Sequence, residues 1–208
     1  MRVTLLGATG LTGTLLLPML EREHTVTVLA RDVERVGTRC ATTRVIGGDA
    51  TDQMAVTDAV GAADAVITLV APRRDGDVGT VRSDATKVLL SAVADVATDA
   101  HLIVVSALGG AASAGRLSWF GRLVYTRAVG RERLTEVDRQ EELIAGCELR
   151  ITVVRPPRLD DESASTPIEV AGRVGSRQTL HRSDLAHYLC AEVARRPTAT
   201  RWVTLVSE

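Results

Sequence analysis

Aromatic side chains and lysine are scarce in this 208-residue sequence, which has a single lysine, Lys87, among its 25 basic residues. Aromatic residues make up 2% of the chain, too few for the clustered rings on which single-stranded nucleic acid stacks. The formal net charge of -1 also excludes a generally basic surface that would hold nucleic-acid phosphates. We therefore expect a small-molecule substrate and no nucleic-acid partner.

Cysteine is also scarce, and long apolar runs are missing. The three cysteines are widely spaced and form no CxxC pair, which predicts free, mostly buried thiols in a reducing compartment. Glycine and threonine interrupt the apolar start of the chain, and no run approaches the ~20 residues of a membrane span. The four histidines show no metal-ligand spacing. We expect a cytoplasmic protein without metal or membrane contact, either a monomer or a small homo-oligomer.

Short runs rich in β-branched residues alternate with longer amphipathic stretches. Apolar residues at helical spacing from Val78 to Val96 indicate one helix, and the charged stretch 131–144, ending before Gly146, indicates another. This alternation predicts right-handed crossovers and a parallel sheet. We expect one doubly wound Rossmann-type α/β domain over residues 1–208, with a mostly parallel sheet and helices on both faces. The expected strands are 2–6, 25–29, 44–46, 65–70, 102–105, 151–154 and 202–206.

Two segments, 106–118 and 155–180, fit neither pattern. The first is small and glycine-rich, and the second carries prolines and polar residues. Both follow predicted strands, so both should lie at the carboxyl edge of the sheet, where open α/β folds bind ligands. We expect them to be substrate-side loops, the alternative being mobile surface loops without a role.

A glycine-rich segment, Gly7–Gly13 with the sequence GATGLTG, directly follows the first predicted strand and precedes the helical run 15–20. A glycine turn in that position lets the backbone approach a pyrophosphate and directs a helix N-terminus at its negative charge. The spacing is GxxGxxG rather than the commoner GxGxxG. Its place at the first strand–turn–helix predicts dinucleotide binding.

Arg31 follows the second predicted strand, where an NAD-binding protein usually has an acidic residue for the ribose hydroxyl. A guanidinium there offers a bidentate partner to a 2′-phosphate, which favours NADP over NAD. Asp32 complicates this prediction, because its carboxylate could hold the ribose instead, and Arg31 could merely pair with it. After the third strand, Asp49 and Ala50 have the position to contact adenine, although Asp49 or Asp52 could instead cap the next helix.

Six short motifs follow one another along the chain: GATGLTG, LARD at 29–32, GDATD at 48–52, VSALGG at 105–110, TVVRPPRL at 152–159 and RSDLA at 182–186. Together they resemble the atypical short-chain dehydrogenase/reductase family, in its NAD(P)H-binding branch similar to biliverdin reductase B (flavin reductase) and NmrA-like proteins. The resemblance spans nearly the whole chain, and GATGLTG and VRPPRL are its more specific parts.

The resemblance implies a role for each matching position. Arg31 would contact the 2′-phosphate, and Asp49 and Ala50 the adenine. Glu142 matches a glutamate that the family carries on a helix. The pyrophosphate loop would consist of Gly7, Thr9, Gly10, Leu11, Thr12 and Gly13, and the nicotinamide side of Val70, Ala71, Ser106 and Pro156.

The Tyr-x-x-x-Lys pair of tyrosine-dependent dehydrogenases is missing. Ser83 stands four residues before Lys87, and Tyr125 is followed four residues later by Val129. We predict an NADPH-dependent reductase of a flavin-like, quinone-like or other conjugated small molecule, a reaction in which the cofactor carries the hydride and water can supply the proton. Ser106 is the candidate catalytic hydroxyl, although it could merely satisfy the local backbone.

Two other functions remain open. A non-catalytic NAD(P) sensor of NmrA-like type, in which nucleotide occupancy alters contact with a partner protein, needs the same cofactor loop. An isomerase or epimerase is disfavoured, because the sequence after Pro157 is short for the larger C-terminal domain of sugar-nucleotide enzymes with this fold.

Overall fold

The computed structural model describes residues 1–37, 40–72, 78–117, 126–127, 129–162, 165–175 and 178–208. Its centre is an eight-stranded sheet in which every neighbouring pair is parallel except the last. Across the sheet the strands are β3 (Arg44–Gly47), β2 (Thr25–Ala30), β1 (Arg2–Leu6), β4 (Ala65–Thr68), β5 (His101–Val105), β6 (Ile151–Arg155), β10 (Arg201–Ser207) and β8 (Pro167–Glu169).

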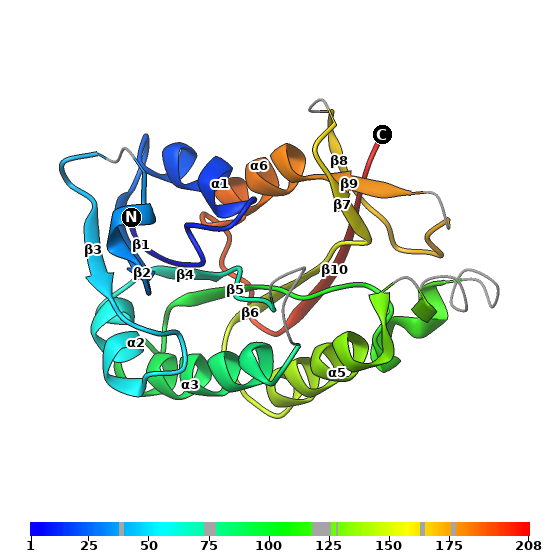
Figure 1. Cartoon of the computed structure of the whole chain (residues 1–208), viewed down its shortest axis with the longest axis horizontal. Coiled ribbons are helices and arrows are strands. Elements are labelled where there is room, and N and C mark those ends of the chain that lie inside the picture. The colour runs from blue at the N-terminus through cyan, green and yellow to red at the C-terminus, as the bar shows by residue number, and fades with distance from the viewer. Residues whose placement is uncertain (38–39, 73–77, 118–125, 128, 163–164, 176–177) are drawn as a thin grey trace.

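Helices cover both faces of the sheet (Figure 1). One face carries α1 (Gly13–Leu20) and α6 (Arg182–Glu192), and the other carries α2 (Gln53–Val60), α3 (Val81–Val96) and α5 (Arg131–Ala145). This arrangement confirms the doubly wound Rossmann-type α/β fold expected from the sequence.

The sheet contributes side chains to two separate cores. In β4, for example, Ile67 packs toward α1 and α6, whereas Val66 packs toward α2, α3 and α5. Both residues are fully buried, because successive side chains of a strand point to opposite faces and both faces are covered. This double burial explains why the predicted strands are apolar at nearly every position.

The chain reverses its direction of travel across the sheet between β1 and β4. From β1 it moves outward through β2 to β3, and it then crosses back to β4 and continues to β5, β6 and β10. The carboxyl ends of β1 and β4 are therefore the topological switch point of the sheet, the place where open α/β sheets bind ligands. The glycine loop at residues 7–13 begins at this switch point.

The segment 155–180 is more structured than a loop. It contains β7 (Arg158–Asp160) and β9 (Thr179–His181), which form a separate two-stranded parallel sheet, and also β8, which pairs antiparallel with β10. Strands of three residues have too few positions for a periodic pattern, and only their distant partners define them. The segment 106–118 likewise contains a 3-10 helix, η2 (Ala111–Arg116), and its Ser118 lies outside the described residues.

Three smaller expectations have mixed outcomes. β4 ends two residues before the predicted Val70, whose N–H contacts the Thr68 hydroxyl at 3.4 Å instead of a neighbouring strand. The three cysteines are free, as expected, but Cys40 is exposed and Cys147 and Cys190 are only half-buried, so the expectation of mostly buried thiols is wrong. In the described part of the chain, no helix is both long and apolar enough to cross a membrane.

Candidate functional site

The loop between β1 and α1 needs glycine at two positions. Gly7 has a φ of +93°, a conformation that side chains with a Cβ rarely adopt. A Cβ on Gly13 would lie 2.2 Å from the Gly7 carbonyl oxygen, which no side chain could tolerate. Gly10 is less constrained, because its Cβ would lie 3.3 Å from that same oxygen. The first and last glycines therefore allow the loop to fold back onto its own backbone.

This tight loop exposes backbone donors. Within the described residues, the N–H groups of Leu11, Thr12 and Gly13 have no hydrogen-bond acceptor. Helix α1, which starts here, has no side-chain cap and no acidic residue in its first turn. Unpaired N–H groups at a helix N-terminus attract an anion through both their hydrogen bonds and the helix dipole. The loop therefore has the donors that a pyrophosphate requires.

Arg31 follows β2, and its side chain is 64% exposed. Its Nε lies 3.8 Å from Oδ2 of Asp49. Asp32 is engaged elsewhere, since its carboxylate accepts a hydrogen bond of 3.2 Å from the Glu34 N–H and caps the 3-10 helix η1 (Val33–Arg35). Arg31 therefore pairs with Asp49, and the alternative that it only pairs with Asp32 is wrong. An ion pair this exposed contributes little to stability.

Asp49 and Asp52 have different local roles. Asp49 Oδ1 accepts hydrogen bonds from the Thr51 hydroxyl at 2.7 Å and from the Thr51 N–H at 2.9 Å. These bonds hold the pKa of Asp49 below its usual value. Asp52 caps α2 by accepting from the N–H groups of Met54 and Ala55. The cap is thus Asp52, and Asp49 shapes the loop that contains Ala50.

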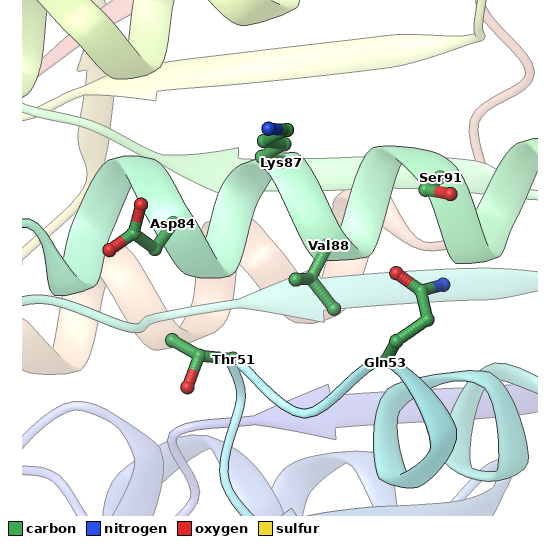
Figure 2. A pocket seen from close by; sticks show the side chains of 6 residues that line it. All are labelled: Thr51, Gln53, Asp84, Lys87, Val88 and Ser91. Atoms are coloured by element: carbon green, nitrogen blue, oxygen red, sulfur yellow. The ribbon is translucent and has the colours of Figure 1, made fainter.

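A surface hollow lies between this loop and α3. Figure 2 shows Thr51 and Gln53, from the segment that enters α2, across from Val88 of α3. Lys87 lines the same hollow. The one lysine of the chain is therefore next to the Asp49 loop, at the β2–β3 end of the candidate site.

The residues predicted for the nicotinamide side follow β4, β5 and β6, which are adjacent strands. Val70 and Ala71 come after β4, Ser106 comes directly after β5, and Pro156 comes directly after β6. The Leu108 N–H donates to the Pro156 carbonyl at 2.9 Å, which joins the last two connections. The structure thus brings these residues to the same edge of the sheet as the glycine loop, while their role in binding stays a prediction.

Ser106 belongs to a buried polar cluster. Its hydroxyl lies 2.9 Å from Oε1 of Glu141, and only 3% of the residue is exposed. Arg155 donates to both oxygens of Glu141, from Nε at 2.8 Å and from Nη2 at 2.7 Å. Its guanidinium also stacks 4.2 Å from the centre of the Trp202 ring. A bidentate ion pair of this kind, nine-tenths buried on both sides, holds both side chains in one orientation.

The glutamate that faces the site is Glu141 rather than Glu142. Glu142, which matches the family's helix glutamate in the sequence, is exposed, whereas Glu141 is 3% exposed. Helical spacing shows the reason, because Glu141 shares the buried side of α5 with Val137 and Ile144, and Glu142 does not. The apolar stripe of this helix was the signal that could have identified Glu141.

The two residues considered as dyad partners differ in what the structure shows. The Ser83 hydroxyl bonds to Glu136 at 3.1 Å inside the contact between α3 and α5, so it is part of the helix packing. Tyr125 lies outside the described residues.

A second titratable pair joins the strands of the small sheet. His181 Nδ1 of β9 lies 2.5 Å from Asp160 Oδ1 of β7, and the His181 side chain is 10% exposed. The hydrogen bond with Asp160 raises the pKa of His181 above its usual value. No group of three or more His, Cys, Asp or Glu side chains that could hold a metal ion occurs among the described residues.

Residues 7–196 match the model of the NAD(P)H-binding family. Among solved structures, an anaerobilin reductase from Escherichia coli O157:H7 is 20% identical with a TM-score of 0.78, and the alignment covers 100% of this chain and 97% of that one. An oxidoreductase from Lactococcus lactis is 16% identical with a TM-score of 0.81, covering 100% and 91%.

A third similar structure is a short-chain dehydrogenase/reductase from Veillonella parvula in complex with NADP. It is 14% identical with a TM-score of 0.79, and the alignment covers 98% of this chain and 93% of that one. At such identities the three structures show a shared fold, and the chemistry must be argued from the residues of this chain.

Proposed function

The chain belongs to the NAD(P)H-binding family, and we propose that it is an NADPH-dependent reductase of a flavin-like, quinone-like or other conjugated small molecule. The observation that carries the proposal is the loop Gly7–Gly13. Its N–H groups at Leu11, Thr12 and Gly13, which have no acceptor within the described residues, lie at the switch point between β1 and β4. A pyrophosphate needs donors of this kind at this place. The residues present therefore fit a dinucleotide.

Each part of the cofactor has candidate residues along this edge. Arg31 would hold the 2′-phosphate, and Asp49 and Ala50 would contact the adenine. When bound, the reduced nicotinamide supplies the hydride, and the protein has to fix donor and acceptor face to face. The pyrophosphate would be held by Gly7, Thr9, Gly10, Leu11, Thr12 and Gly13, and the nicotinamide would lie near Val70, Ala71, Ser106 and Pro156.

The preference for NADP rests on Arg31. Among the described residues, its exposed guanidinium has only a long, solvated contact to Asp49, so a 2′-phosphate can take the place of that contact at little cost. Asp32 caps η1 through Oδ1, which ties one of its carboxylate oxygens to the local turn and supports Arg31 as the phosphate contact. The Veillonella parvula protein binds NADP on the same fold, which supports NADP as a cofactor to test.

A conjugated acceptor fits a site without a Tyr–Lys dyad. The chain has one lysine, Lys87, with a serine rather than a tyrosine four residues before it, and this lysine lines the hollow beside Thr51. Both facts support a mechanism without such a pair. Reduction of a flavin, quinone or tetrapyrrole needs no such pair, since water can supply the proton. The shared fold of an anaerobilin reductase supports a tetrapyrrole as one substrate class to test.

One observation favours the alternative of a non-catalytic NAD(P) sensor. The predicted catalytic hydroxyl, that of Ser106, is bonded to Glu141 inside a buried ion pair. A sensor would need the cofactor loop and no catalytic hydroxyl at all.

Steady-state oxidation of NADPH with a panel of flavins, quinones and tetrapyrroles tests the proposal. We expect at least one acceptor to be reduced well above the background rate of the free cofactor. Cofactor binding without reduction of any acceptor would indicate the sensor.

The cofactor loop has its own test in a glycine pair. Gly13→Ala places a Cβ against the Gly7 carbonyl and should abolish the rise in melting temperature that NADPH produces, because a ligand stabilises only a fold that binds it. Gly115→Ala is the control, since its Cβ meets nothing within 4 Å. If the wild-type protein shows no thermal shift with millimolar NADPH or NADH, dinucleotide binding is wrong.

A further inference from the structure

The hydrogen atom of the Ser106 hydroxyl has a defined direction. Arginine stays protonated in proteins, and the two bonds from Arg155 make both oxygens of Glu141 acceptors. An ionised carboxylate has no hydrogen to give. In the 2.9 Å contact between Ser106 Oγ and Glu141 Oε1, the donor must therefore be the serine.

The Ser106 oxygen keeps its acceptor capacity. A hydroxyl has one hydrogen and two lone pairs, and among the described residues no donor is bonded to Ser106 Oγ. Ser106 directly follows β5, at the edge of the sheet shared with the glycine loop. A group bound at this edge that reaches Ser106, which is 3% exposed, would meet an oxygen that can accept a hydrogen bond and whose own hydrogen is engaged by Glu141.

We propose that Ser106 recognises an N–H donor of the bound cofactor or substrate and does not protonate the substrate. In this polarity the serine oxygen accepts from the ligand while the serine hydrogen stays directed at Glu141, and Glu141 and Arg155 are the positioning residues that set it. The inference rests on the proposed function and deepens it. The cofactor gives the hydride, the one proton that the reduction needs then comes from water, and the substrate carbonyl that gains electrons is placed away from Ser106.

Reversing this polarity is unfavourable. For Ser106 to donate to a ligand, its hydrogen must leave a carboxylate that is 3% exposed, where water cannot replace it. A hydrogen bond to a charged group is worth a factor of roughly 10 to 150 in an equilibrium. A carbonyl or oxyanion facing Ser106 is disfavoured by about that factor relative to an N–H.

Two sources can provide the N–H: the carboxamide of the nicotinamide or the imide of a flavin-like substrate. Matched ligand pairs distinguish them. For the cofactor, NADP is compared with 3-acetylpyridine adenine dinucleotide phosphate, in which a methyl ketone replaces the carboxamide. For the substrate, lumiflavin is compared with its N3-methyl derivative. Isothermal titration calorimetry measures binding in each case, without reference to turnover.

We expect the wild-type protein to prefer the N–H ligand of one pair by roughly 5- to 150-fold, the effect of leaving one buried hydrogen-bonding group unpaired. Ser106→Ala should remove that preference by weakening the N–H ligand, while Ser106→Thr, which keeps the hydroxyl, should retain it. The pair that responds identifies the source. Equal binding within both pairs by the wild-type protein, or a preference that survives in Ser106→Ala, would overturn the proposal.

The positioning role of Glu141 and Arg155 has a separate test. The double variant Glu141→Leu/Arg155→Met replaces the buried ion pair by apolar groups of similar volume, an exchange that proteins often tolerate. It frees the Ser106 hydrogen, so the acetylpyridine or N-methyl ligand should bind more tightly. The affinity ratio between the N–H ligand and its matched analogue should therefore decrease. Glu142→Leu, the neighbouring exposed residue, should leave the preference unchanged.

A double variant whose preference stays at the wild-type value would show that Glu141 does not set the polarity. If the double variant does not fold, the Ser106 variants alone decide the proposal. Failure of the proposed function is distinguishable, because a wild-type protein that binds neither NADP nor NADPH contradicts the function itself, whereas binding without discrimination contradicts only the role of Ser106.

Discussion

Two arginine–carboxylate pairs lie along the carboxyl edge of the sheet, and they differ in exposure and in the geometry of the contact. Arg31 and Asp49 are 64% and 41% exposed and lie 3.8 Å apart. Arg155 and Glu141 are 7% and 3% exposed and form a bidentate contact at 2.7 Å and 2.8 Å. The first pair can exchange its partner at little cost, whereas the second cannot lose a partner without leaving a buried charge.

Their places in the sheet explain this difference. Arg31 and Asp49 follow β2 and β3, at one margin of the sheet (Figure 1), where both side chains remain exposed to solvent. Arg155 ends β6, which is flanked by β5 and β10 and covered by α5. An arginine–carboxylate pair is therefore an exchangeable surface contact at one end of this edge and a rigid frame around Ser106 at the other.

The largest expected effect is on the buried pair. Glu141→Gln removes the charge that balances Arg155 and should lower the free energy of unfolding by about 3–5 kcal/mol, because an unpaired buried charge remains. Glu142→Gln, the same change one residue along the exposed side of α5, should stay within about 0.5 kcal/mol. Urea denaturation measures both, and a Glu141→Gln protein as stable as Glu142→Gln would end the distinction between the pairs.

The exposed pair should respond in binding rather than in stability. Arg31→Ala removes a charge-assisted bond to the 2′-phosphate and should weaken NADP by roughly 10- to 150-fold, while NAD binding changes little. The free energy of unfolding should barely move, since the lost contact to Asp49 is solvated. Calorimetric titration of both cofactors measures this. If Arg31→Ala lowers the affinity for NADP and for NAD by the same factor, the role of Arg31 is structural.

A smaller change of opposite sign is expected at the partner of Arg31. Asp49→Asn keeps the hydrogen bonds from Thr51 but removes the carboxylate that competes with a phosphate. NADP affinity should rise by up to about fivefold, the upper range for an exposed ion pair. Asp58→Asn breaks a comparable exposed pair with Arg44 and should leave both cofactors unaffected. A fall in NADP affinity in Asp49→Asn would mean that Asp49 orders Arg31 for the phosphate.

The smallest effect concerns the His181–Asp160 pair, which is intermediate in exposure. The pKa of His181 is higher in the folded state than in the unfolded state. Protonated His181 therefore stabilises the fold fully below the unfolded pKa of about 6.5, and this contribution is lost as the pH rises through the raised folded-state pKa. The wild-type protein should therefore lose more stability than Asp160→Asn across that window. If the free energy of unfolding depends on pH in the same way in Asp160→Asn and in the wild-type protein, the pair does not titrate in this window.

Much of the fold could be predicted because its signals are local. All seven strands expected from the sequence occur, within two residues at each end, and Gly146 ends α5 as expected. The short strands of 155–180 could not be found in this way, because β8 exists only through its pairing with β10. In the site, the glycine loop and the position of Arg31 after β2 were readable, since both depend on a strand end and the turn that follows it.

The sequence by itself determined the alternation of strands and helices, the glycine turn and the single lysine, which has no tyrosine four residues before it. Only the tertiary structure decided that Arg31 pairs with Asp49, that Arg155 pairs with Glu141, and that the Ser106 hydrogen is directed at a carboxylate 35 residues away in the chain. The physical reason is that a turn or a helical stripe is encoded by neighbours in the sequence, whereas the partner and burial of a charge are set by which distant segments the fold packs together.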